Sequence, residues 1–137
     1  MKQLGIYLTF SGNCKDALNF YKNCLNGEIV SMQSFGESPM KVDEKDKNLI
    51  MHSEFRSDEI KFMASDSMPG HDVKPGNNIS LSVNLTDEKE QTEIFQKLSE
   101  GGKVTMPLED TFWNARFGML TDKYGINWML NCEKAKQ

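Results

Sequence analysis

Hydrophobic and polar residues alternate in two segments of the chain, residues 4–10 and 79–85. A period of two places the apolar side chains on one face of an extended chain, so both segments are predicted to be half-buried β-strands. The two patterns are related by a constant offset, because Ile79 follows Leu4 by 75 residues. The apolar positions are Leu4, Ile6, Leu8 and Phe10 in the first strand and Ile79, Leu81, Val83 and Leu85 in the second.

A helical pattern follows each strand at the same offset. Residues 13–25 and 87–99 both carry apolar residues at the spacing of one helix face. Asn13 is expected to cap the first helix, and Gly27 and Gly102 are expected to end the two helices. The apolar stripes are Ala17, Phe20, Tyr21 and Cys24 in the first helix and Ile94, Phe95 and Leu98 in the second.

Each half of the chain then ends in a predicted β-hairpin, within residues 51–65 and 117–132. Ile60 and Ile126 occupy equivalent places at an offset of 66, and the charged segment 37–48 accounts for the shorter spacing. The chain therefore reads twice as strand, helix and three strands. This pattern predicts an α+β fold of two βαβββ modules, with mixed sheets around a concave cavity that could hold a small molecule.

Glycine and proline cluster between the two modules. We therefore expect module one at about 1–68, a connection at about 69–77 and module two at about 78–134. Together they would form a single domain over residues 1–137.

Composition and charge exclude several classes of protein. The chain has 137 residues and a formal net charge of −4, whereas a nucleic-acid-binding protein needs a surplus of cations to displace counterions from phosphates. No apolar run approaches the ~20 residues that span a bilayer, and the N-terminal residues lack the apolar stretch of a signal peptide. We therefore expect no nucleic-acid partner, no membrane association and a cytoplasmic location. Cys14, Cys24 and Cys132 are spaced too widely for a zinc site and are expected to be reduced thiols.

One polar cluster could support catalysis. His52 and Glu54 alternate onto one face of a predicted strand, and Asp66 ends the neighbouring strand. A histidine with two carboxylates could act as an acid–base centre or bind a metal in a non-standard way. The alternative is that these residues form a solvated polar face, and that His71 is an exposed loop residue.

A group of aromatic residues near the C-terminus is the stronger candidate for ligand binding. The segment 112–119 (FWNARFGM) contains aromatic residues around a single cation, and a second tryptophan follows on the last strand. Such a set could hold a planar or partly anionic molecule, with Arg116 contacting a carboxylate or phosphate. The alternative is that the aromatic residues fill the core. The candidate ligand-binding residues are Phe112, Trp113, Arg116, Phe117, Met119 and Trp128.

The paired βαβββ pattern resembles the vicinal-oxygen-chelate superfamily of glyoxalase I, ring-cleaving dioxygenases and bleomycin-resistance proteins. Within it the chain is similar to the PhnB-like family, also described as 3-demethylubiquinone 3-methyltransferase-like. The resemblance covers most of the chain, and it implies a glyoxalase-like fold and a homodimer. It is carried by YLTFSGNCKDALNFYKNCLNGEI (7–29), IMHSEF (50–55), FMASD (62–66), GNNISLSVNL (76–85) and GGKVTMPLEDTFWNARFGMLTDKYGINWML (101–130).

The resemblance also implies where a metal would bind. Metal-dependent relatives take one ligand, His, Glu or Gln, from the first and last strand of each half. At the matching places this chain offers residues 5–7, Phe62 or Met63, residues 77–79, and Met129, which supply no histidine and no carboxylate. We therefore expect no standard metal centre and no cofactor. Methyl transfer is not expected either, because the chain has no strand–Gly-x-Gly–helix unit for a nucleotide-type cofactor.

Three functions remain open after these observations. The first is a small-molecule binding protein that uses the aromatic cluster without a metal. The second is an enzyme (lyase, isomerase or dioxygenase-like) with a non-standard centre at His52, Glu54 and Asp66. The third is a homodimeric interaction module without a ligand. The sequence does not decide whether the protein is an enzyme.

Overall fold

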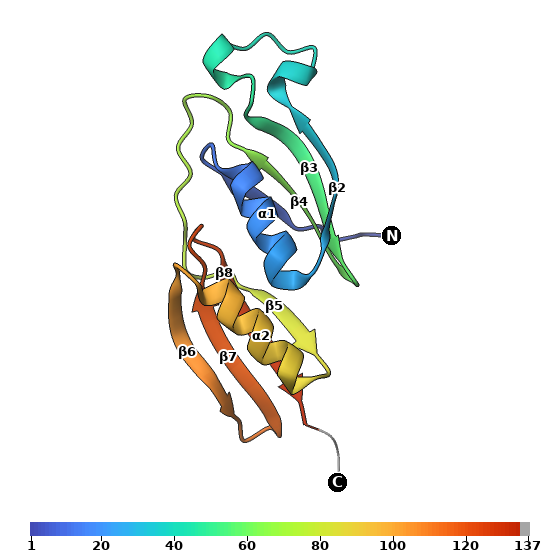
Figure 1. Cartoon of the computed structure of the whole chain (residues 1–137), viewed down its shortest axis with the longest axis vertical. Helices are drawn as coiled ribbons and strands as arrows, with labels where there is room; N and C mark the ends of the chain where they lie inside the picture. The colour runs from blue at the N-terminus through green and yellow to red at the C-terminus, as the bar shows by residue number, and fades with distance from the viewer. Residues whose placement is uncertain (135–137) are drawn as a thin grey trace. The chain divides into compact units, whose positions relative to one another are not determined.

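The computed structural model describes residues 1–134, which form two compact units. The first unit extends from Met1 to Lys74 and the second begins at Pro75 (Figure 1). Each unit contains a single α-helix and a four-stranded sheet. None of the helices in the described residues has the length and apolar content needed to cross a membrane.

The first unit has the predicted order of strand, helix and three strands. Its sheet has the strand order β1-β4-β3-β2, in which β1 and β4 are parallel and the other pairs are antiparallel. The charged segment between β2 and β3 contains two short 3₁₀ turns. The elements are β1 (Tyr7–Phe10), α1 (Cys14–Leu25), β2 (Glu28–Ser34), η1 (Phe35–Glu37), η2 (Glu44–Asp46), β3 (Ile50–Ser57) and β4 (Ile60–Asp66).

The second unit repeats this topology. Its strand order is β5-β8-β7-β6, and again the first and last strands of the unit are the parallel pair. The predicted α+β class, with two βαβββ modules and mixed sheets, is confirmed. The elements are β5 (Leu81–Leu85), α2 (Glu88–Ser99), β6 (Lys103–Asp110), β7 (Ala115–Thr121) and β8 (Asn127–Glu133).

The first strand of each unit is shorter than the alternating pattern predicted. Leu4 is 98% exposed and Ile79 is 76% exposed, and both lie before the strands that begin at Tyr7 and Leu81. A strand forms only where a neighbouring strand completes its hydrogen bonds. β4 pairs with residues 7–10 and β8 pairs with residues 81–85, so the alternating residues before these positions are not part of a strand. The pattern therefore identified the two strands but placed their starts too early.

The core of each unit lies between its helix and one face of its sheet. In the first unit Phe55 and Phe62 are cross-strand partners with stacked rings 4.7 Å apart, and the ring of Tyr21 on α1 contacts Phe62 edge-on at 5.8 Å. In the second unit Phe95 and Leu98 of α2 are buried against the sheet. The predicted helix stripes are therefore the faces that cover the sheets, although Phe20 is only half-buried.

Gly27 and Gly102 follow the helices as predicted, but for a different reason. The left-handed backbone positions are taken by the residues before them, Asn26 (φ 51°) and Gly101 (φ 75°). Gly27 and Gly102 instead lie against the neighbouring strand. A β-carbon on Gly27 would lie 2.7 Å from the carbonyl oxygen of Arg56, and one on Gly102 would meet the carbonyl oxygen of Thr121. Each module therefore needs a residue without a side chain at this point.

We predict that Gly27→Ala and Gly102→Ala each lower the free energy of unfolding by about 1–3 kcal/mol, because the added methyl group forces backbone atoms apart. Urea unfolding followed by circular dichroism measures this change. Gly76→Ala is the matched control, since its β-carbon would meet only Asn78 at 3.7 Å. Equal stability of Gly102→Ala and Gly76→Ala would contradict the close approach.

Candidate functional site

In each unit one face of the sheet is covered by the helix, and we call the opposite face the open face. Cross-strand partners share a face. The buried pair Ser53 and Ala64 lies on the covered face of the first sheet. The pair Gly118 and Leu130 lies on the covered face of the second, where a β-carbon on Gly118 would meet the ring of Phe95. The residues next to these pairs therefore belong to the open faces.

His52 and Glu54 lie together on the open face of the first sheet, as their spacing predicted. Each adjoins the buried Ser53 on β3, and Glu54 pairs with Met63 of β4. Asp66 does not join them. It is buried, 4% exposed, on the covered face, next to α1. The expectation that the three residues form one centre is therefore wrong in its geometry, because a whole sheet separates Asp66 from the other two.

Asp66 has a clear structural partner set instead. Its carboxylate accepts hydrogen bonds from the backbone N–H of Cys14 at 2.9 Å and of Ile50 at 2.8 Å. Cys14 is the first residue of α1, so Asp66 caps this helix in place of the predicted side chain of Asn13, which makes no cap hydrogen bond. Burial, together with the negative charge of Asp66, raises the pKa of the Cys14 thiol to about 12. Cys14 is therefore an unreactive core thiol at neutral pH.

We predict that Asp66→Ala lowers the free energy of unfolding by about 2–4 kcal/mol, because two buried backbone donors lose their acceptor. Asp72→Ala, in the exposed connection, is the control and should change it by no more than about 0.5 kcal/mol. Chemical denaturation of the two variants tests this. If Asp66→Ala left stability unchanged, the capping role would be refuted.

The structure adds Tyr7 to the polar open face of the first sheet. The Tyr7 hydroxyl lies 3.4 Å from Nδ1 of His52, and the two ring centroids are 5.9 Å apart. Tyr7 pairs with Met63 through the parallel contact of β1 with β4. The alternating pattern already placed Tyr7 opposite the buried Leu8. Its contact with His52 was not visible in the sequence, since it depends on which strands become neighbours.

Phe112 and Trp113, in the turn between β6 and β7, and Phe117 on β7 form a continuous set of rings, which we call the aromatic cluster. Phe112 meets Trp113 edge-on with centroids 5.0 Å apart, and Trp113 meets Phe117 at 5.8 Å. The indole N–H of Trp113 donates to Oδ1 of Asn131 on β8 at 3.4 Å. Trp113 is nevertheless 50% exposed and Phe112 is 97% exposed. The rings are thus oriented by the protein but accessible to solvent.

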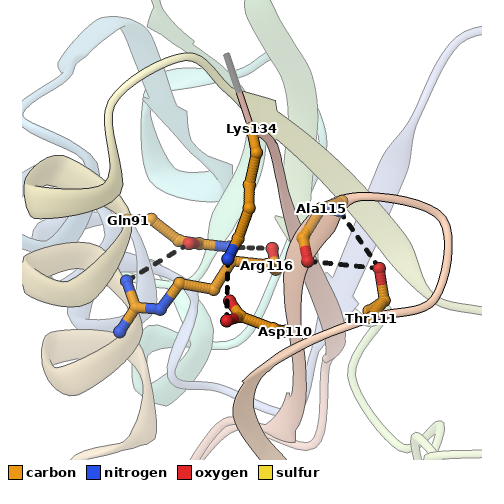
Figure 2. A network of polar contacts seen from close by, with 6 residues as sticks. All are labelled: Gln91, Asp110, Thr111, Ala115, Arg116 and Lys134. Atoms are coloured by element: carbon orange, nitrogen blue, oxygen red, sulfur yellow. Dashed lines mark hydrogen bonds and ion pairs between the residues drawn. The ribbon is translucent and has the colours of Figure 1, made fainter. Parts of the chain in front are cut away.

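Hydrogen bonds and an ion pair fix both ends of the turn that contains Phe112 and Trp113. The backbone N–H and the hydroxyl of Thr111 both donate to the carbonyl oxygen of Ala115, at 2.8 and 3.1 Å. Lys134 forms an ion pair with Asp110 at 2.7 Å (Figure 2). Its backbone N–H also donates to the carbonyl oxygen of Asn114. These contacts limit the positions that Phe112 and Trp113 can take.

Arg116 does not face the aromatic cluster. It pairs with the buried Cys132 on the covered face, and its guanidinium donates to α2: to the Thr92 hydroxyl at 2.8 Å and the Glu88 carbonyl at 3.1 Å. Gln91 of α2 completes this contact by donating to the backbone carbonyl of Arg116 at 2.8 Å (Figure 2). Burial and the nearby Glu88 carboxylate raise the pKa of Cys132, while the Arg116 charge lowers it. Arg116 therefore joins helix to sheet and is turned away from the predicted ligand.

Trp128 is also on the covered face. It is 1% exposed, and its indole N–H donates to Oδ2 of Asp122 at 2.9 Å. Met119 and its partner Met129, by contrast, share the open face with Phe117. Of the six residues predicted to bind a ligand, the structure brings together Phe112, Trp113, Phe117 and Met119, and places Arg116 and Trp128 on the other side of the sheet.

The donors at the family's metal positions do not fit a divalent ion. In the first sheet the matching positions include Tyr7 and Met63, which are partners on the open face. In the second half, residues 77–79 lie before β5, and the strand partner of Met129 is Ser82. Thioethers and neutral hydroxyls are weak ligands for the ions that carboxylate and imidazole sites bind. Within residues 1–134 no three His, Cys, Asp or Glu side chains are grouped closely enough to hold a metal.

Neither strand-to-helix connection within residues 1–134 is the Gly-x-Gly turn that nucleotide-binding folds use to hold a cofactor. Helices α1 and α2 both follow a strand, where such a turn would lie, and their first backbone N–H groups are taken by the carboxylates of Asp66 and Asp87. Each sheet contains a single parallel pair, unlike the mostly parallel sheet of nucleotide-binding folds.

Comparison with solved structures defines the class of fold. A glyoxylase/bleomycin resistance protein/dioxygenase domain from Frankia sp. EAN1pec matches with a TM-score of 0.67, covering 98% of each chain. The sequences are only 12% identical, so this likeness concerns the fold alone. The chain therefore has the glyoxalase/bleomycin-resistance fold, as the sequence predicted.

Closer relatives define the family. The family model "3-demethylubiquinone-9 3-methyltransferase" matches residues 2–131. The crystal structure of PA1353 from Pseudomonas aeruginosa is 40% identical, with a TM-score of 0.88, over 98% of this chain and 100% of that one. A PhnB protein from Bacillus cereus is 32% identical, with a TM-score of 0.80, over 96% and 99%. Protein YjdN of Escherichia coli is 33% identical over 96% of this chain and 95% of its own. The chain belongs to the PhnB-like 3-demethylubiquinone-9 3-methyltransferase family.

Proposed function

We propose that this protein binds a small molecule on the open face of the second sheet, through the aromatic cluster and without a metal ion. The observation that carries this proposal is the state of Trp113, which is half exposed although Phe117 and Asn131 fix its orientation. A tryptophan that only filled the core would be buried. A surface tryptophan without a function would not need two partners to fix its orientation.

The geometry supports binding because little order has to be gained. Rings held in edge-to-face contact have already lost much of their rotamer freedom, so a ligand that stacks on them costs less entropy than one that must order a mobile surface. Aromatic contacts contribute about 0.5–1.5 kcal/mol each beyond the area they bury. Met119 and Met129 extend the same face with adaptable apolar side chains.

Tryptophan fluorescence tests this proposal, because the two tryptophans lie on opposite faces of one sheet. We predict that a ligand found by thermal-shift screening changes the emission of the wild type, and that Trp113→Phe abolishes this change while Trp128 still emits. The ligand should also raise the free energy of unfolding by about 2.7 kcal/mol at 100 times its Kd. Phe112→Ala should weaken binding, whereas Met68→Ala, an exposed apolar control in the first unit, should not. A ligand that perturbs Trp113→Phe as strongly as the wild type would contradict the proposal.

A second candidate function is proton-transfer catalysis on the open face of the first sheet. It is favoured by the contact of Tyr7 with His52, in which the phenol can donate to a neutral imidazole, and by Glu54 on the same face. His52 and Glu54 could remove a proton next to a carbonyl group and return it to a different atom, which is an isomerase reaction. If a leaving group departs from the neighbouring carbon instead, the same proton removal gives a lyase reaction. Asp66 has no part in this candidate centre.

The proton-transfer candidate predicts exchange with solvent. In D₂O the wild type should incorporate deuterium next to the carbonyl group of at least one member of a panel of 2-oxo acids, as followed by ¹H NMR. His52→Asn should slow this exchange about 100-fold or more. His71→Asn is the matched control, because His71 lies in the exposed connection. No exchange above the buffer rate, or equal rates in both variants, would eliminate this function.

We further propose a cytoplasmic location and a homodimer. The three cysteines, Cys14, Cys24 and Cys132, are all free and buried, which suits a reducing compartment. The homodimer rests on the assembly expected of this superfamily, and light scattering measures it directly. A ligand-free interaction module is the least favoured of the three functions, because the aromatic cluster would then have no occupant.

A further inference from the structure

The charges around the aromatic cluster point to the class of ligand. Glu109 on β6 is the cross-strand partner of Phe117, so both side chains lie on the open face. The β-carbons of such a pair are about 5 Å apart. Glu133 on β8 alternates with Cys132, which is buried on the covered face, and therefore lies on the open face with Asn131. Both glutamates are exposed. The cluster is thus flanked by a carboxylate on each neighbouring strand.

Among the described residues, the cations close to the aromatic cluster in sequence are paired or point elsewhere. Lys134 forms its ion pair with Asp110, and Arg116 donates to α2 on the covered face. Lys103 pairs with Thr121, at the far end of the β6–β7 ladder from Phe117. Within residues 1–134, Asp110 and Lys134 cancel as an ion pair, which leaves the carboxylates of Glu109 and Glu133 as a formal surplus of two negative charges next to the aromatic cluster.

Aromatic faces and carboxylates favour the same sign of charge. The face of a phenyl or indole ring is negative because of its quadrupole, and it attracts a cation within about 6 Å of the ring centroid. Carboxylates close to the rings add to this potential and repel anions. An anionic ligand, which the sequence suggested because of Arg116, would meet neither a free cation nor a favourable ring face.

We infer that the aromatic cluster takes an organic cation, a quaternary ammonium or protonated amine joined to an apolar or planar group. This inference rests on the proposed function, since it assigns the ligand class of that same face. The planar group stacks on the rings of Trp113 and Phe117, and the ammonium group lies between the ring faces and the carboxylates of Glu109 and Glu133. A quaternary ammonium suits this site better than a metal ion, because its charge is spread over several alkyl groups and its hydration is weak.

Three soluble probes of similar size separate charge from shape: benzyltrimethylammonium, benzyl alcohol and benzoate. Each is titrated into the full-length protein at 50 mM salt while tryptophan emission is followed. We predict that the ammonium probe binds about tenfold more tightly than benzyl alcohol, and that benzoate binds most weakly. Raising the salt to 500 mM should weaken the ammonium probe several-fold and leave benzyl alcohol nearly unchanged.

Two substitutions test the carboxylates. Glu109→Gln combined with Glu133→Gln should remove most of the preference for the ammonium probe while keeping the affinity for benzyl alcohol. Glu100→Gln is the matched control, because this exposed glutamate caps the C-terminus of α2, which packs on the covered face. Circular dichroism confirms that the variants are folded.

The outcomes distinguish the two proposals. If benzyl alcohol or benzoate binds as tightly as the ammonium probe, with a signal that Trp113→Phe removes, the cation inference fails and the proposed function stands. If Glu100→Gln reduces the preference as much as the double variant, the assignment to Glu109 and Glu133 fails. If no probe changes the emission of Trp113 up to 100 mM, both proposals are overturned.

Discussion

The parallel pairing of the first and last strands of each unit is the constraint on which the rest of the structure depends. It joins residues 56 positions apart in the first unit (Tyr7 and Met63) and 47 apart in the second (Leu81 and Trp128), and it leaves the chain only one side of the sheet for its helix. The helix then defines a covered and an open face. The face on which a candidate residue lies determines what it can contact. Asp66, Arg116 and Trp128 make stabilising contacts on the covered faces. His52, Glu54 and the aromatic cluster lie on the open faces.

The two open faces have the same geometry and different chemistry. Because Ser53 and Gly118 are equivalent covered positions, His52 corresponds to Phe117 and Glu54 to Met119. One module therefore presents an imidazole and a carboxylate where the other presents an aromatic ring and a thioether. The helix caps differ in a similar way, since α1 is capped from β4 by Asp66 and α2 by the residue before it, Asp87. The two modules therefore share their strand order and pairing, and they differ in side chains on which the fold does not depend.

Periodicity predicted the repeat, the helix faces and the open-face position of His52 and Glu54, because these depend on neighbours in the sequence. It failed where the answer depends on strand pairing. Arg116 adjoins Phe117 in the sequence, yet consecutive strand residues point to opposite faces, so the cation and the rings are separated by the sheet. The contact of Tyr7 with His52, the exposed ends at Leu4 and Ile79, and the close approach at Gly102 likewise required the register of strands distant in the chain.

The turn at residues 111–115 has a consequence for the speed of binding. Thr111 and Ala115 close it by hydrogen bonds, and Lys134 holds its flanks through Asp110 and Asn114. For the proposed binding at the aromatic cluster, a surface held in this way needs no rearrangement before or after an encounter, so association should follow diffusion with a single kinetic phase. Selectivity among ligands would then reside in how long each one stays bound.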